Sequence, residues 1–185
     1  KLDTTVGKWG VRNKALAGNA TDRGVQWRKY TVRPGFPKDS PSNLAWLPKK
    51  AVKGLNAFRL TIDLEAKSRP PKMCVTFQGD GLRDGLSGWT LILSPRGDKV
   101  RATIERYDRL VYQSDAVKYE VDDKKPTQLE LLYYGKRLTV RIGSQTLFDQ
   151  SPIRAIPDQT NIGIATWGPR LRITEIELRA PARTR

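Results

Sequence analysis

Apolar and polar residues alternate along most of this chain, and residues 127–150 show the alternation most clearly. In the run 137–142, Arg-Leu-Thr-Val-Arg-Ile, every second residue is apolar, so one face is buried and the other wet. Gly135-Lys136 and Gly143-Ser144 each fit a two-residue hairpin turn. The stretch therefore predicts a three-stranded antiparallel meander, and we expect a second sheet to cover its apolar face.

The same period-two pattern recurs on both sides of this stretch, with turn signals about every 8–12 residues. The predicted strands lie within residues 8–18 (a hairpin around 12–14), 24–33, 57–66, 73–78, 89–94, 100–105, 110–112, 127–134, 137–142, 145–150, 161–167 and 171–178. We expect the last two to form a strand pair joined by Gly168-Pro169. The phase slips between Ile173 and Ile176, which indicates a β-bulge.

About thirteen short strands and no helical period predict an all-β fold, a two-sheet antiparallel β-sandwich or jelly roll. Within the 185 residues, we expect 1–179 to form a single domain, which buries roughly 70% of its unfolded surface. Residues 180–185 resemble a basic tail or linker stub, so we expect a domain of a larger polypeptide. No run of 18 apolar residues exists, so no membrane-spanning helix is predicted.

The charge balance predicts an acidic partner. The chain has 34 Lys and Arg against 19 Asp and Glu, for a net charge of +15. Between residues 28 and 53 a single acid, Asp39, accompanies seven basic residues. Prolines interrupt the strand pattern from Pro34 to Lys53, so we expect a long loop here, and such loops are common binding sites.

We predict that this segment binds the ligand. The site residues would be Arg28, Lys29, Arg33, Trp46, Lys49, Lys50 and Lys53. Trp46 would either pack within the loop or stack on a sugar ring, while the cations hold sulfate or carboxylate groups. Alternatively, the charge only maintains solubility. If the segment does not bind, the cationic strand faces are the next candidates, with Arg101, Arg137, Arg141 and Arg172.

Several kinds of chemistry are excluded or weakened by composition. The chain has no His and one Cys, so it has no His-dependent nucleophile system, and zinc and copper sites are not expected. Cys74 is expected to be a buried, inert thiol. We expect no cofactor, although Asp80 and Asp84 in a Gly-rich loop leave calcium open.

Aromatic residues and paired carboxylates supply the remaining candidates. Trp9, Trp27, Trp89 and Trp167 fall in strand patterns and are expected in the core, whereas Tyr107, Tyr112 and Tyr134 are surface candidates. Glu175 and Glu177 share a strand face roughly 6–7 Å apart, as do Asp63 and Glu65. Such pairs could flank a glycosidic bond, but a solvated outer face is the favoured interpretation.

The order of strands and turns resembles a known superfamily. The segments Trp9–Leu16, Phe58–Leu64, Gly88–Leu93, Gly135–Ile142 and the closing stretch from Ile162 to Leu178 carry the resemblance. They are similar to the concanavalin A-like lectin/glucanase superfamily, nearest to the laminin-G-like and 3-keto-disaccharide-hydrolase-like domains of large bacterial exported proteins. The resemblance implies saccharide binding or processing, and an extracellular or periplasmic location. The Glu-x-Asp-x-x-Glu strand of its glucanases is absent.

The interpretation that combines these points is a non-catalytic binding domain of a larger exported protein. Its ligand would be an anionic or sulfated glycan, or an acidic protein surface. A glycoside-processing enzyme and a structural assembly module that docks an acidic partner are the alternatives. Nucleic acid ranks lowest, because none of the usual nucleic-acid-binding motifs is present.

Overall fold

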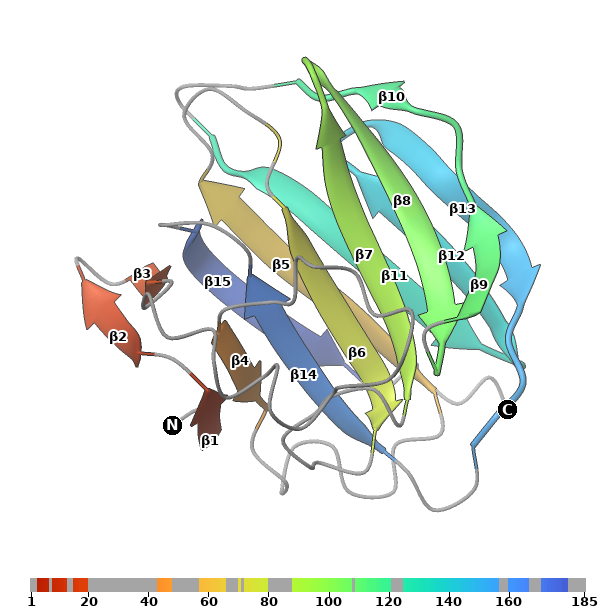
Figure 1. Ribbon diagram of the computed structural model, residues 1–185, viewed down its shortest axis with the longest axis horizontal. Helices are drawn as coiled ribbons and strands as arrows, with labels where there is room; N and C mark the ends of the chain where they lie inside the picture. The colour runs from red at the N-terminus through yellow and green to blue at the C-terminus, as the bar shows by residue number, and fades with distance from the viewer. Residues whose placement is uncertain are drawn as a thin grey trace.

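The chain folds into two antiparallel β-sheets packed face to face, which confirms the predicted all-β sandwich (Figure 1). The structure is a computed structural model. It describes residues 3–6, 8–12, 15–19, 43–47, 57–65, 70, 72–79, 88–107, 109–120, 125–156, 160–166 and 171–179. Side chains are described from Trp46 onward within these ranges, except those of residues 166, 171, 172 and 174. No helix occurs in the described part of the chain, and hence none that could span a membrane.

Sheet A has eight strands. Its order is β1 (Asp3–Val6), β4 (Asn43–Trp46), β14 (Asn161–Thr166), β6 (Met73–Gly79), β7 (Trp89–Arg96), β8 (Lys99–Arg106) and β10 (Val117–Lys118). The eighth strand, β9 (Arg109–Gln113), pairs with β8. β10 lies beside the first residues of β8 and β9 beside the last ones, so these two short strands share one edge.

Sheet B has seven strands. Its order is β13 (Gln145–Pro152), β12 (Arg137–Ile142), β11 (Thr127–Tyr134), β5 (Phe58–Glu65), β15 (Leu171–Arg179), β3 (Ala15–Asn19) and β2 (Lys8–Arg12). The predicted meander is confirmed as β11, β12 and β13. Gly135 and Lys136 both have positive φ, 58° and 63°, as a type I′ hairpin turn requires. The predicted β2–β3 hairpin and the bulge after Ile173 are also present.

The predicted pairing of the last two strands is wrong. β14 lies between β4 and β6 in sheet A, whereas β15 lies between β5 and β3 in sheet B. Ile164 of β14 and Ile173 of β15 are both buried in the core between the sheets. The chain therefore crosses from one sheet to the other between these strands, because each apolar face is buried by the opposite layer.

Three strands were not predicted, namely β1, β4 and β10. The expected uninterrupted loop over 34–53 is wrong at β4, which pairs with β1 on one side and β14 on the other. These backbone hydrogen bonds to distant segments stabilise a strand that its local sequence does not reveal. The described ranges hold fifteen strands against about thirteen expected. The predicted strand at 24–33 lies outside them.

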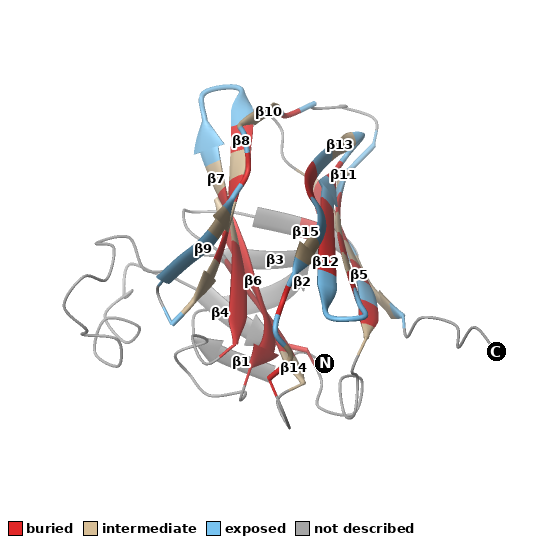
Figure 2. Ribbon diagram, turned by 90° about the vertical axis from the view of Figure 1, so that its right-hand side faces the viewer, coloured by how far each residue is buried: buried red, intermediate tan, exposed pale blue. Residues whose placement is uncertain are grey.

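The hydrophobic core lies between the two sheets, as the side view shows (Figure 2). Along β5, residues at positions 58, 60, 62 and 64 are buried and those between them are not. At the centre, the rings of Phe58, Phe77 and Tyr133 lie 5.7–6.1 Å apart. This spacing suits edge-to-face and tilted aromatic contacts, which add to the stabilisation from apolar burial.

Candidate functional site

Trp46 is the one predicted site residue that the structure describes, and its side chain is only 3% exposed. Trp46 ends β4, and its ring lies over Gly163 of β14 and Gly79 of β6. The ring therefore fills the space above two glycines and is not displayed to a ligand. The basic residues predicted with it lie outside the described residues, so the binding segment stays a prediction. They are Arg28, Lys29, Arg33, Lys49, Lys50 and Lys53.

The face of sheet A that points away from the core is buried at one side and open at the other. On β6, Cys74, Thr76 and Gln78 are buried, although they alternate with the core residues of that strand. On β9, by contrast, Leu110 is 57% and Val111 42% exposed. Among the described residues, this face is most accessible at β8 and β9.

We define the β8–β9 face as Arg101, Thr103, Glu105, Leu110 and Gln113. Arg101, Thr103 and Glu105 are half-buried and alternate with the core residues of β8, while Gln113 pairs with Thr103 across to β9. The face thus presents guanidinium, hydroxyl, carboxylate and amide groups on a rigid pair of strands. These groups can donate to and accept from the hydroxyls of a sugar, and Leu110 adds apolar surface.

The turn between β8 and β9 holds a stacked arginine. The Arg106 guanidinium carbon lies 5.3 Å from the ring centre of Trp89 and 5.1 Å from that of Tyr107, within cation–π range. Trp89 is buried in the core, as predicted, and Tyr107 is 46% exposed. Tyr107 is among the surface candidates predicted from sequence, whereas Arg106 is not. The available signal was the alternation of arginines with tyrosines through residues 106–112.

The other two tyrosines differ in exposure. Tyr134 is exposed at the end of β11, as a surface candidate should be. Tyr112 is half-buried, and its hydroxyl donates a hydrogen bond of 2.8 Å to the carbonyl oxygen of Pro152. Tyr112 therefore links the edge strand of sheet A to the end of β13 in sheet B.

On the outer face of sheet B, most of the described charges pair with one another. Arg59 and Arg141 both form ion pairs with Glu130, and the Arg179 guanidinium pairs with Glu177. Arg137 donates to the carbonyl oxygen of Gln150. Arg137 and Arg141 were predicted as candidates if the 28–53 segment does not bind, and both already make contacts within the domain. The side chain of Arg172, another of these candidates, is not described.

The paired carboxylates considered for glycosidase chemistry lie on this same face. Glu175 pairs in register with Asp63 of β5. The Asp63 carboxylate accepts a hydrogen bond from Gln128, and Glu177 pairs with Arg179. These contacts fit the interpretation of a solvated, charge-paired sheet face.

Two further sequence predictions concern Cys74 and metal binding. Cys74 is free and buried, as predicted, and burial raises the pKa of its thiol to about 12. The described residues include no group of three or more His, Cys, Asp or Glu that could hold a metal ion. Asp80 and Asp84, which left calcium open, lie outside the described ranges.

No family model matches the sequence, and no curated protein matches it. By structure, the chain is similar to the carbohydrate binding module CBM66 from Bacillus subtilis, with a TM-score of 0.59 and 12% identity over 96% of this chain and 94% of that one. It is also similar to the VIP36 exoplasmic/lumenal domain in its Ca2+/Man-bound form, with a TM-score of 0.62 and 12% identity over 100% and 84%. A Bacillus subtilis protein of unknown function with a galectin-like fold has a TM-score of 0.58 and 12% identity over 97% and 88%. These likenesses show the fold.

Proposed function

Starting from a concanavalin A-like sandwich, we propose that this chain is a non-catalytic glycan-binding domain of a larger exported protein, with a preference for anionic glycans. The observation that carries the proposal is the open β8–β9 face, where polar side chains stand on two rigid strands beside exposed apolar ones. A carbohydrate binding module of matching length and a mannose-bound lumenal domain share the fold, which supports the proposal.

Sugar recognition needs hydrogen-bond partners of both kinds next to an apolar surface. Thr103 and Gln113 supply a donor and an acceptor each, side by side in register across β8 and β9. Leu110 supplies apolar contact for the C–H face of a sugar ring. Because these residues lie on paired strands and not in a long loop, their positions are set before the ligand arrives, which lowers the entropy lost on binding.

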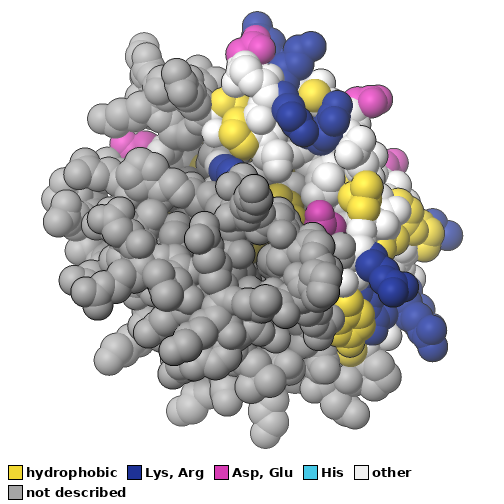
Figure 3. Space-filling view, in the orientation of Figure 1, with side chains coloured by type: hydrophobic (Ala, Val, Ile, Leu, Met, Phe, Trp, Pro, Cys, Tyr) yellow, Lys and Arg dark blue, Asp and Glu magenta, His cyan; other side chains and the backbone are white. Residues whose placement is uncertain are grey.

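The preference for anionic glycans rests on charge. The chain carries a net charge of +15. In Figure 3, which looks onto this side of sheet A, Lys and Arg side chains gather near the β7–β8 turn and again near the β8–β9 turn, with hydrophobic side chains close by. A positive field steers an anionic polymer toward the surface and strengthens its binding at low salt.

A glycan array probed at low and high salt tests the function. We expect retention of sulfated or uronic acid glycans that weakens with salt, and about tenfold weaker binding for Thr103→Val combined with Gln113→Ala. Thr61→Val on the outer face of sheet B is the matched control and should bind as the unmodified chain does. Failure to retain any glycan at low salt, or equal binding by all three proteins, would refute the proposed function or its site.

A further inference from the structure

Among the described residues, aromatic rings and not an acid hold Arg106 at the end of β8. Its guanidinium carbon lies 5.3 Å from the Trp89 ring centre and 5.1 Å from that of Tyr107. The π faces of these rings attract the cation, but they accept none of its in-plane N–H groups. Arg106 therefore keeps its hydrogen-bonding capacity while its position is restrained.

The donors of Arg106 lack partners among the described residues. Its Nε is buried without a hydrogen-bond partner, and the described ion pairs involve other arginines. A buried guanidinium donor that is left without an acceptor destabilises a fold, and such groups are rare in native structures. An anion placed against the other N–H groups of the guanidinium would supply acceptors for them.

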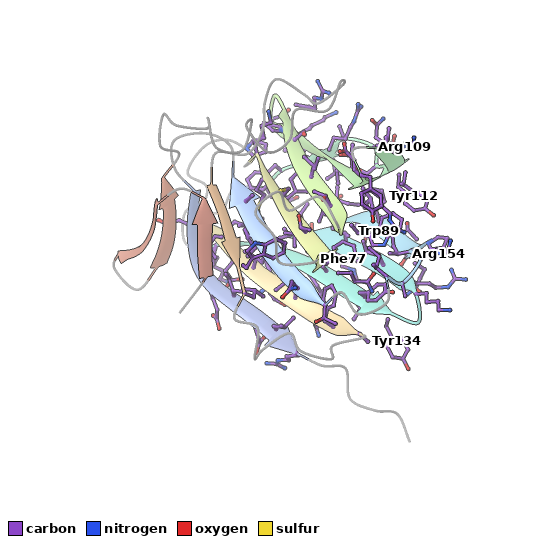
Figure 4. The ribbon with its side chains drawn as sticks, turned by 60° about the horizontal axis from the view of Figure 1, so that its bottom comes forward. Phe77, Trp89, Arg109, Tyr112, Tyr134 and Arg154 are labelled. Atoms are coloured by element: carbon purple, nitrogen blue, oxygen red, sulfur yellow. The ribbon has the colours of Figure 1, made fainter. Side chains whose placement is uncertain are left out.

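Two further arginines lie near Arg106 and Trp89. Arg109 is the register partner of Arg106 across the β8–β9 turn. The backbone of Arg154 lies at Trp89, because its carbonyl oxygen accepts a 2.8 Å hydrogen bond from Trp89 Nε1. Figure 4 shows Trp89, Tyr112, Arg109 and Arg154 together at this edge of the sandwich. Both additional side chains are exposed, and neither forms an ion pair with a described residue.

The backbone is strained at Tyr107, the residue that follows Arg106. Tyr107 has a φ of 49°, the left-handed region that bulky residues rarely adopt. Its ring is nevertheless one of the two that contact Arg106. Strain of this kind is concentrated at functional sites, where the surrounding structure maintains it. A glycine or asparagine would suit this turn better if its only role were to reverse the chain.

We propose that Arg106, Arg109 and Arg154 form a binding site for a planar or tetrahedral anionic group, the carboxylate or sulfate of an acidic glycan. The site rests on the proposed glycan-binding function and adds a charge-selecting group at the edge of the sandwich, next to the β8–β9 face. Arg106 would bind the anion through its free N–H groups, since guanidinium geometry matches carboxylate and sulfate oxygens. Arg109 on β9 and Arg154, just after the end of β13, would add charge, and the exposed side of Tyr107 would contact the sugar ring.

Titration of the full chain with sodium sulfate and with glucuronate, at constant ionic strength in chloride, tests the site directly. We expect saturable shifts of the Trp89 Nε1–H and Arg106 Nε–H signals in ¹⁵N spectra. Arg106→Gln should weaken binding of a heparin-derived oligosaccharide about tenfold, and Arg106→Lys should recover only part of it. Arg96→Gln removes the same charge from the end of β7, and because it would act only through the overall positive field, it should weaken binding less than Arg106→Gln does.

The outcomes separate this site from the function on which it rests. Shifts that fail to saturate, or equal loss of affinity for Arg96→Gln and Arg106→Gln, would overturn the site even if neutral glycans bind elsewhere. Saturable sulfate binding without retention of any glycan would keep the anion site and refute the glycan-binding function. Tighter binding of a single-stranded oligonucleotide than of the sulfated oligosaccharide would overturn the glycan as the source of the anion.

Asp108, next to Tyr107 in the sequence, lies outside the described residues; if its charge opposes the site, Asp108→Asn should strengthen sulfate binding.

Discussion

The ring of Trp46 lies so close to Gly163 that a Cβ atom at Gly163 would come within 2.8 Å of Cε3 and 2.9 Å of Cζ3. Gly79 stands in the same relation to the far edge of the ring, with its Cβ position 2.9 Å from Cη2. Because neither glycine has a side chain, the Trp46 ring can pack directly on the backbone of the neighbouring strands β14 and β6. Trp46 consequently stabilises the outer side of sheet A.

We expect Gly163→Ala to lower the free energy of unfolding by about 1–3 kcal/mol, because the added methyl group would overlap a buried, rigid ring. Urea unfolding followed by circular dichroism measures the change. In a Trp46→Leu background the same substitution should cost less than in the unmodified chain, since the obstructing ring is gone. An unchanged unfolding midpoint for Gly163→Ala alone would contradict the packing described.

Cys74 should make stability fall at alkaline pH. Burial raises the pKa of its thiol from 9.0 to about 12. Above pH 9 the unfolded chain therefore loses a proton that the folded chain retains, and unfolding becomes more favourable as pH rises. The contribution approaches ~1.4 kcal/mol per pH unit between the two pKa values.

Because Tyr and Lys also titrate in this window, the prediction concerns the difference between the unmodified chain and Cys74→Ala. The unmodified chain should lose stability more steeply between pH 9 and 12. Its native thiol should also react slowly with a disulfide reagent and rapidly in urea. Parallel pH profiles, or rapid native labelling, would contradict burial of this group.

We expect Glu130 to contribute more to the stability of the fold than Glu177, which lies on the same sheet. The Glu130 side chain is 13% exposed and serves both Arg59 and Arg141. We expect Glu130→Gln to reduce stability by about 1 kcal/mol, and by less at high salt. Glu177→Gln, which removes a more exposed partner of Arg179, should stay within ~0.5 kcal/mol. If the two substitutions lower the free energy of unfolding equally in urea titrations, the two partners and the lower exposure of Glu130 add nothing to stability.

The basic segment predicted from sequence remains to be tested in solution. Replacing Lys49, Lys50 and Lys53 together by Gln removes three positive charges from the chain. If this segment also binds the anionic glycan, retention on a heparin column should fall, with a flatter dependence on salt. Elution at the salt concentration of the unmodified chain would leave the β8–β9 side as the binding surface.

Much of the fold could be predicted because its signals are local. A strand with one buried face repeats every two residues, as 58–65 and 137–142 do, and glycine marks turns that require positive φ, as at Gly135. The bulge after Ile173 was visible as a slip in the same pattern. The burial of Trp89 and of Cys74 followed from the strands that contain them.

The candidate site was harder to predict because it depends on contacts between distant segments. The proline-flanked run 43–46 resembled a loop, and only its pairing with β1 and β14 makes it a strand. Trp46 appeared suited to a ligand because nothing near it in sequence shows Gly79 and Gly163 beneath its ring. Likewise, Arg106 and Arg154 are 48 positions apart, and both contact Trp89, Arg106 through its guanidinium and Arg154 through its backbone carbonyl.

By itself, the sequence determined that this protein is a β-sandwich, where most strands begin and end, and that it carries a strong positive charge. The tertiary structure decided which sheet each strand joins, which aromatic rings are buried, and which arginines lie together. The physical reason is that alternation reports only whether one face of a strand is apolar. β14 and β15 carry the same local signal, and their placement in opposite sheets is decided by the backbone hydrogen bonds and side-chain packing that distant strands provide.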